Sequence, residues 1–141
     1  MSAAKRFFLD TNILVYTFDQ SAPEKRRRAL GLLEEALSTQ RGSISWQVVQ
    51  EFLNLATRRF KVPLTPEDAR LYLDRVLLPL CEVLPSAALY REGLRLAERY
   101  QLAFYDALIV AAALNAGAKI LYSEDLQHGQ VIEGVTIHDP F

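Results

Sequence analysis

Two short apolar runs constrain the fold of this chain most strongly, because each is nearly uninterrupted. They cover residues 6–9 and 119–123. Strands that are buried on both faces of a parallel sheet have this pattern. Helix-like and strand-like patterns alternate along the whole chain, which is typical of an α/β domain. The predicted strands are residues 6–9, 43–45, 81–84, 119–123 and 135–138.

Helix ends are marked by residues that cap helices. Ser21 with Glu24 three residues later has the pattern of a capping box, so we predict a helix start there. Thr65 shows a similar pattern, and Ser86 is in a position to cap a helix that runs to about residue 100. Gly117 follows an alanine-rich stretch and predicts a helix end. These helices would flank the central sheet.

The size and composition of the chain fit one soluble domain. Its 141 residues, taken as a single domain 1–141, suit one core, and the formal net charge of −1 argues against coating nucleic acid by bulk attraction. The single cysteine, Cys81, excludes an internal disulfide and fits a reducing cytoplasm. No apolar run approaches the roughly 20 residues that span a bilayer. Asp10 ends the first run too early for a signal peptide. We therefore expect a cytoplasmic protein with no membrane segment.

Four carboxylates end or interrupt apolar elements: Asp10, Glu51, Asp106 and Asp125. Carboxylates beside buried surface are costly unless a partner compensates them, and four brought together would repel one another. A hard divalent cation such as Mg2+ or Mn2+ removes that repulsion. Asp10 and Asp125 each come just after a predicted strand, where ligands bind in open parallel sheets. The pattern therefore indicates metal-dependent phosphate chemistry.

Each acid also has a purely structural interpretation. Asp10 could cap the helix that follows it, and Asp106 could cap a helix over residues 107–116. Glu51 lies at the edge of the apolar face of its helix, where glutamates are usually solvated. Glu124 stands beside Asp125, and spacing alone does not say which of the two would bind a cation.

Other polar residues are weaker candidates. The basic clusters at residues 25–28 and 58–61 are most simply solvated helix faces, although they are the first places to seek phosphate contacts. His128 is a weaker candidate for substrate contact, and His138 lies in a strand pattern as a structural histidine would.

Three segments together resemble the PIN-domain family, and within it the VapC-type toxin ribonucleases. They are FFLDTNILVY, SWQVVQEFLNLATRR and FYDALIVAAALNAGAKILYSEDLQHGQ. The resemblance implies a Rossmann-like α/β domain with a central, mainly parallel sheet of about five strands flanked by helices. It implies a Mg2+-dependent (or Mn2+-dependent) endoribonuclease, a homodimer, and a small antitoxin protein as partner.

The resemblance also implies roles for individual residues. Asp10 and Asp106 would be the principal metal ligands, with Glu51 and Asp125 completing the acid set. It favours Asp125 over Glu124. The residues that would orient ligands or the RNA substrate are Thr11, Asn12 and Ser123.

Four other interpretations compete with this one, and two of them lack a residue or motif that they would need. A phosphatase of the haloacid dehalogenase type would usually have a second Asp where this chain has Asn12. A nucleotide-binding oxidoreductase would need a glycine-rich loop after the first strand, and none is present. A binding module would use the acids only as caps and surface charges. A PIN nuclease acting in RNA processing rather than as a toxin would share the same site. The RNA target is not encoded in any recognisable feature.

Overall fold

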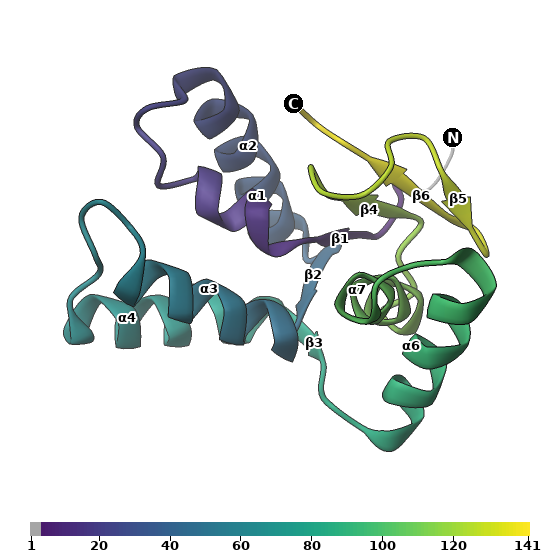
Figure 1. Cartoon of the computed structure of the whole chain (residues 1–141). Helices are drawn as coiled ribbons and strands as arrows, with labels where there is room; N and C mark the ends of the chain where they lie inside the picture. The colour runs from purple at the N-terminus through teal and green to yellow at the C-terminus, as the bar shows by residue number, and fades with distance from the viewer. Residues whose placement is uncertain (1–3) are drawn as a thin grey trace.

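A six-stranded sheet forms the centre of the computed structural model, which describes residues 4–141 (Figure 1). The strand order is β3-β2-β1-β4-β6-β5, and every neighbouring pair is parallel except β5 with β6. The strands are β1 (Phe7–Leu9), β2 (Gly42–Ser45), β3 (Cys81–Val83), β4 (Ile120–Tyr122), β5 (Val131–Ile132) and β6 (Val135–His138). The predicted α/β class with a mainly parallel sheet is confirmed.

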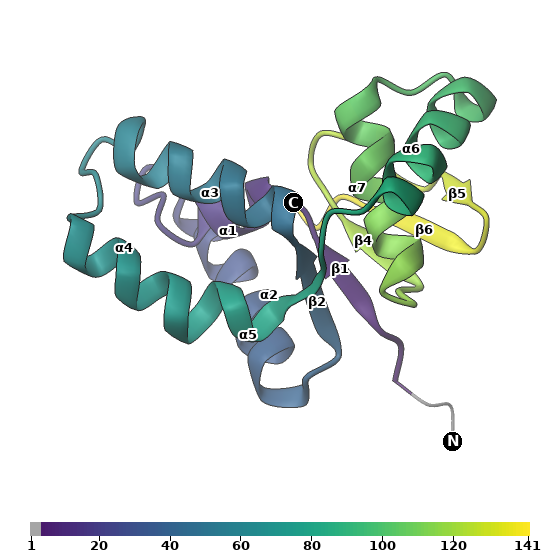
Figure 2. The same ribbon diagram turned by 90° about the horizontal axis from the view of Figure 1, so that it is seen from below.

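Helices cover both faces of this sheet. Figure 2 shows β1 and β2 running between α1 to α5 on one side and α6 and α7 on the other. The helices are α1 (Thr11–Tyr16), α2 (Pro23–Thr39), α3 (Trp46–Arg58), α4 (Pro66–Tyr72), α5 (Leu78–Leu80), α6 (Ala87–Tyr100) and α7 (Phe104–Asn115), with a π-helical segment η1 (Leu73–Leu77) between α4 and α5. Within residues 4–141, none of these helices has the length and apolar character needed to cross a membrane.

Burial of the central strand explains its sequence. Phe7, Phe8 and Leu9 are all buried, although successive strand residues point to opposite faces. Both faces are therefore covered, as the uninterrupted apolar run predicts. Helix α2 packs very closely against β2, because a Cβ at Gly42 of β2 would overlap Ala36 of α2.

Helix α7 lies between the sheet and α6. Its residues from Ala107 to Ala113 are all buried, which is expected when both sides of a helix are covered. The close approach of α6 depends on Gly93, where a Cβ would collide with Leu108. This packing fixes the first turn of α7, which carries Asp106.

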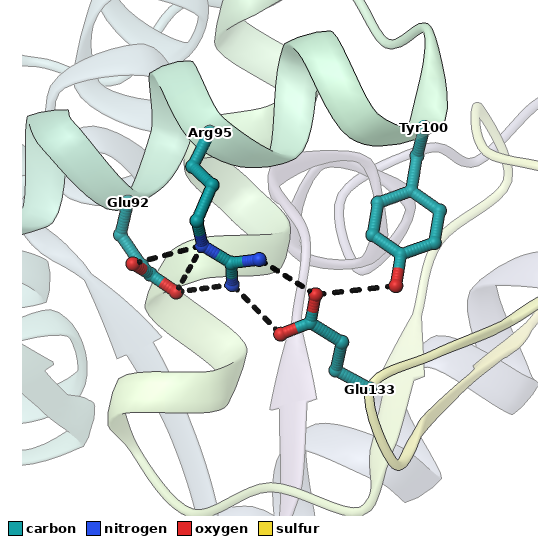
Figure 3. A network of polar contacts seen from close by, with 4 residues as sticks. All are labelled: Glu92, Arg95, Tyr100 and Glu133. Atoms are coloured by element: carbon teal, nitrogen blue, oxygen red, sulfur yellow. Dashed lines mark hydrogen bonds and ion pairs between the residues drawn. The ribbon is translucent and has the colours of Figure 1, made fainter.

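The sheet has one strand more than predicted. Strand β5 has only two residues and pairs antiparallel with β6 through a turn at Glu133 and Gly134, both with positive φ. Its sequence signal is weak because only Ile132 of the two is buried. Figure 3 shows how the turn is tied to α6: Arg95 donates to both oxygens of Glu133, at 2.9 and 2.7 Å, and also binds Glu92. Tyr100 donates to the same Glu133 carboxylate at 3.1 Å.

The helix-end predictions are partly correct. Thr65 and Ser86 cap α4 and α6 as predicted, through bonds from the backbone N–H of Asp68 and Leu89. Gly117 follows α7 in a left-handed conformation, with φ of 73°.

One of these predictions was wrong, and one structural alternative is excluded. Ser21 does not cap α2, because its backbone and hydroxyl donate to Asp19 and the helix begins at Pro23 after Ala22. Asp106 does not cap α7 either. The helix already begins at Phe104, which places Asp106 within the first turn.

Candidate active site

The first acid lies at the carboxyl end of the central strand. Asp10 follows β1, and its backbone N–H donates to the carbonyl of Tyr122 at the end of β4, at 3.0 Å. Because β1 and β4 are parallel neighbours in register, the residues that follow them meet at one edge of the sheet. Ser123 is therefore brought next to Asp10, although the two are 113 positions apart in the sequence.

Asp10 is 7% exposed, and both oxygens of its side chain are hydrogen-bonded. Oδ1 accepts from the backbone N–H of Thr11 at 2.7 Å, and Oδ2 accepts from the Ser123 hydroxyl at 2.8 Å. The first of these bonds makes Asp10 the N-cap of α1. Asp10 therefore caps α1 and also belongs to the group of acids in the candidate site.

Burial and neighbouring charges disfavour the ionised form of Asp10. Its pKa is raised from 3.8 to about 6, chiefly by burial. The hydrogen bonds from Ser123 and Thr11 oppose this rise, and the negative charges of Glu51 and Asp125 add to it. Three of the four predicted acids are therefore close enough to influence one another.

Asn12 holds the turn that carries Asp125. Its amide nitrogen donates to Asp125 Oδ2 at 3.0 Å, and its amide oxygen accepts from the backbone N–H of Glu124 at 3.2 Å. The turn is closed by the Asp125 backbone N–H, which donates to the Ser123 hydroxyl at 3.1 Å. Asn12 and Ser123 thus fix the position of Asp125 relative to Asp10.

The two adjacent acids of this turn have different partners. Glu124 accepts a 2.8 Å hydrogen bond from Lys25 of α2, and this interaction, foremost, lowers the pKa of Glu124. Asp125 instead contacts Asn12, and its charge raises the pKa of both Asp10 and Asp106. Of the pair, Asp125 is the one that acts electrostatically on the other acids.

Glu51 is held at the exposed rim by two donors. Thr11 donates to Oε2 at 3.4 Å, and Gln47, one helical turn earlier on α3, donates to Oε1 at 2.8 Å. Gln47 also reaches the carbonyl of Tyr105 at 3.4 Å. This amide therefore links the helix of Glu51 to the first turn of α7.

Asp106 is half-buried in that first turn. Burial raises its pKa, and the charge of Asp125 contributes further. The acids thus form a series from buried Asp10, through half-buried Asp106, to the exposed Glu51 and Asp125. Such a series opens toward solvent on one side and ends at the sheet on the other.

The donor chemistry of this cluster fits a hard divalent cation. Every candidate ligand offers carboxylate oxygen, which Mg2+ and Mn2+ prefer, and neighbouring negative charges add to the rise in the pKa of Asp10 and of Asp106. In the part of the chain that the structure describes, no three acidic, histidine or cysteine side chains stand in a ready-made metal cluster. The ligand roles of Asp10, Glu51, Asp106 and Asp125 remain predictions.

Comparison with known proteins assigns the family. The family model described as "PIN domain" matches residues 7–133, from the first strand to the turn before β6. The chain belongs to the PIN domain family. No curated protein sequence matches it significantly.

Solved structures share the fold of this PIN domain. A toxin–antitoxin complex from Klebsiella pneumoniae is 22% identical with a TM-score of 0.68, over 95% of this chain and 97% of that chain. VapC20 of Mycobacterium tuberculosis, described as a Sarcin-Ricin loop cleaving toxin, is 19% identical with a TM-score of 0.60, over 84% and 89% of the two chains. VapBC2 from Rickettsia felis, bound to a promoter DNA fragment, is 21% identical with a TM-score of 0.57, over 94% and 96%.

Sequence reasoning missed two residues that organise this PIN domain. Gln47 was overlooked, although its position one turn before Glu51 on the same helix face is a usable signal. Lys25 was considered as a solvated surface charge or a phosphate contact, yet it binds Glu124. His128 has structural contacts, because its Nδ1 accepts from the Asp139 backbone at 3.0 Å and its ring packs against His138.

Proposed function

We propose that this PIN domain is a Mg2+- or Mn2+-dependent endoribonuclease that hydrolyses RNA phosphodiester bonds. The observation that carries the proposal is the environment of Asp10, a buried carboxylate whose pKa is raised by burial and by the charges of Glu51 and Asp125. A protein gains nothing in stability from gathering such charges, so the cluster is best explained by chemistry. One structural relative is described as a toxin–antitoxin complex, and another as a Sarcin-Ricin loop cleaving toxin.

The chain's own residues would hold and orient the cation and the substrate. A bound divalent cation would lower the pKa of a water molecule and would offset negative charge on the scissile phosphate. Asp10 and Asp106 would be the principal ligands, with Glu51 and Asp125 beside them. Thr11, Asn12 and Ser123 donate hydrogen bonds to three of these carboxylates and so restrict their orientation.

Attack by water would leave a 5′-phosphate and a 3′-hydroxyl on the RNA fragments. A 2′,3′-cyclic phosphate would mean that the RNA 2′-hydroxyl attacks instead, and that product would contradict the proposed mechanism. Mapping the ends of the fragments therefore tests the mechanism directly.

The decisive experiment incubates the purified protein with total cellular RNA in Mg2+, in Mn2+ and in EDTA. Asp10→Asn is the test variant. Asp74→Asn is the matched control, because Asp74 is an exposed acid on η1. We expect discrete fragments that require the metal and Asp10 and that persist in the control. A folded protein that cuts no RNA source and binds no Mn2+ would instead support a binding module.

We further propose that the nuclease acts in the cytoplasm as the toxin of a toxin–antitoxin pair and forms a homodimer. Toxin–antitoxin complexes among the structural relatives support a small antitoxin as partner. Expression of the wild type should arrest growth, expression of Asp10→Asn should not, and a small protein encoded beside the gene should relieve the arrest. Cleavage without growth arrest would indicate a PIN nuclease of RNA processing. Sedimentation analysis measures the oligomeric state.

A further inference from the structure

A second feature lies beside the acid cluster: a cleft with a volume of about 80 Å³ between α3, α6 and α7. None of the residues that line it is charged. Its aromatic and amide side chains come from three helices: Trp46, Gln47 and Gln50 from α3, Tyr90 from α6 and Tyr105 from α7.

Two of the aromatic residues that line this cleft are exposed. Tyr105 is 71% exposed and Tyr90 is 45% exposed. Phe104 packs edge-on against the Tyr105 ring with centroids 5.7 Å apart, so the ring is supported from one side. An exposed, supported aromatic ring costs free energy in water unless a partner covers it, and a flat partner can stack on it.

The cleft is continuous with the candidate active site. Gln47 lines the cleft and donates to Glu51, and its contact with the Tyr105 carbonyl joins the cleft wall to the residue before Asp106. Figure 1 shows the first turn of α3 on the side that faces α7. A group bound in the cleft would therefore lie beside the side chain that holds Glu51 and beside the residue that precedes Asp106.

We propose that this cleft binds one unpaired nucleobase of the RNA, next to the scissile phosphate. The inference rests on the proposed nuclease function and adds a determinant of cleavage-site choice. An uncharged lining suits a neutral planar base rather than a phosphate. Aromatic rings stack on bases, and the exposed amide of Gln50 can pair with a base edge, as in other proteins that bind single-stranded RNA.

The test compares Tyr105→Leu with Tyr105→Phe, which keeps the ring. Val131→Ala is the control, since Val131 is an exposed apolar residue on β5, at the other end of the sheet from β3. Tyr105→Leu should lower kcat/KM by about tenfold, mainly through KM, and Tyr105→Phe should restore it. The fragment ends should also lose base preference at one position beside the cut in Tyr105→Leu alone. Unchanged kinetics and an unchanged cleavage pattern in Tyr105→Leu would overturn the proposal.

A binding measurement separates this proposal from the nuclease function. A 2-aminopurine base in a short single-stranded RNA is titrated with each protein in EDTA. Quenching by the wild type and Tyr105→Phe, but not by Tyr105→Leu, would support the base site even if no RNA is cut. Equal quenching by all three proteins, or quenching by none, would overturn it.

The competing occupant of an aromatic cleft is a second copy of the chain. Sedimentation of the same variants distinguishes the two. If the cleft binds a base, the Tyr105→Leu protein should keep the oligomeric state of the wild type. A change in oligomeric state on this substitution would assign the cleft to self-association and overturn the proposed base site.

Discussion

Ser123, after strand β4, donates a 2.8 Å hydrogen bond to Asp10, after strand β1, and both side chains are buried. This bond joins two parallel strands just beyond their last register pair, and it opposes the rise in the pKa of Asp10. The same hydroxyl accepts from the Asp125 backbone. One serine therefore connects two acids of the candidate site.

Replacing this serine tests that connection. Ser123→Ala should raise the pKa of Asp10 further and destabilise the fold by about 1–3 kcal/mol, because a buried acceptor loses its donor. Cleavage should fall as Asp10 and Asp125 lose a shared support. Denaturant unfolding and NMR titration of the Asp10 carboxyl measure the two effects. An unchanged Asp10 pKa would contradict the role assigned to the hydroxyl.

The raised pKa of Asp10 predicts how stability depends on pH without divalent ions. The folded protein holds this proton more tightly than the unfolded chain, so the stabilising contribution is complete below about pH 4 and is lost as pH rises to about 6. The difference of about two pKa units corresponds to about 3 kcal/mol.

Asp10→Asn should remove the loss of stability at rising pH, because asparagine is neutral and can still cap α1. We expect the variant to be more stable than the wild type at pH 7–8 in EDTA, with the advantage disappearing near pH 4. Denaturant unfolding over this pH range measures it. Parallel stability curves for the two proteins would show that Asp10 does not carry the penalty.

Gln47 should act through Glu51 rather than on the RNA directly. Gln47→Leu removes the 2.8 Å donor and should lower kcat several-fold. In a Glu51→Gln background the same substitution should have little further effect on kcat, because the two positions would contribute one shared interaction. Additive effects in the double variant would show that Gln47 acts independently of Glu51.

Lys25 should control the ionisation of Glu124. In Lys25→Met the pKa of Glu124 should rise toward its ordinary value, since the lysine is the main cause of its depression. NMR titration measures the change, and Arg28→Met is a control from the same basic stretch. A Glu124 pKa that stays low in Lys25→Met would contradict this pairing.

The ion pairs of Figure 3 predict a local effect on the hairpin. Arg95→Met frees Glu133 from α6, so the amides of β5 should exchange hydrogen faster while those of β1 stay protected. Hydrogen exchange measured by NMR or mass spectrometry reports both strands. Equal exchange in wild type and variant would show that the hairpin does not depend on this contact.

The part of the site that the sequence predicts best is the part fixed by the sheet. A carboxylate after each of two buried parallel strands must lie at the same edge, and the charge of Asp125 does raise the pKa of Asp10 there. Glu51 and Asp106 lie on helices, whose placement depends on side-chain packing such as that of Gly93 with Leu108. Their spacing in the sequence therefore does not predict that they lie at this edge. Only the family resemblance predicts it.

Local patterns failed where competing contacts were available. Ser21 bonds to Asp19 instead of capping α2, and α7 begins at Phe104 without any side-chain cap. The choice between Glu124 and Asp125 depends on Lys25, which is 99 positions away from Glu124. Such long-range contacts carry no local sequence signal.

The hydrogen bond from Asn12 to Asp125 also has a consequence for synthesis of the protein. Its two partners are 113 positions apart, so the acid cluster stays incomplete on a translating ribosome until β4 and the following turn have left the exit tunnel. A nascent chain that already displays Asp10, Glu51 and Asp106 still lacks the strand that holds Asp10 in place. If the protein cuts RNA as we propose, its order of synthesis keeps it inert beside the message and ribosome that produce it.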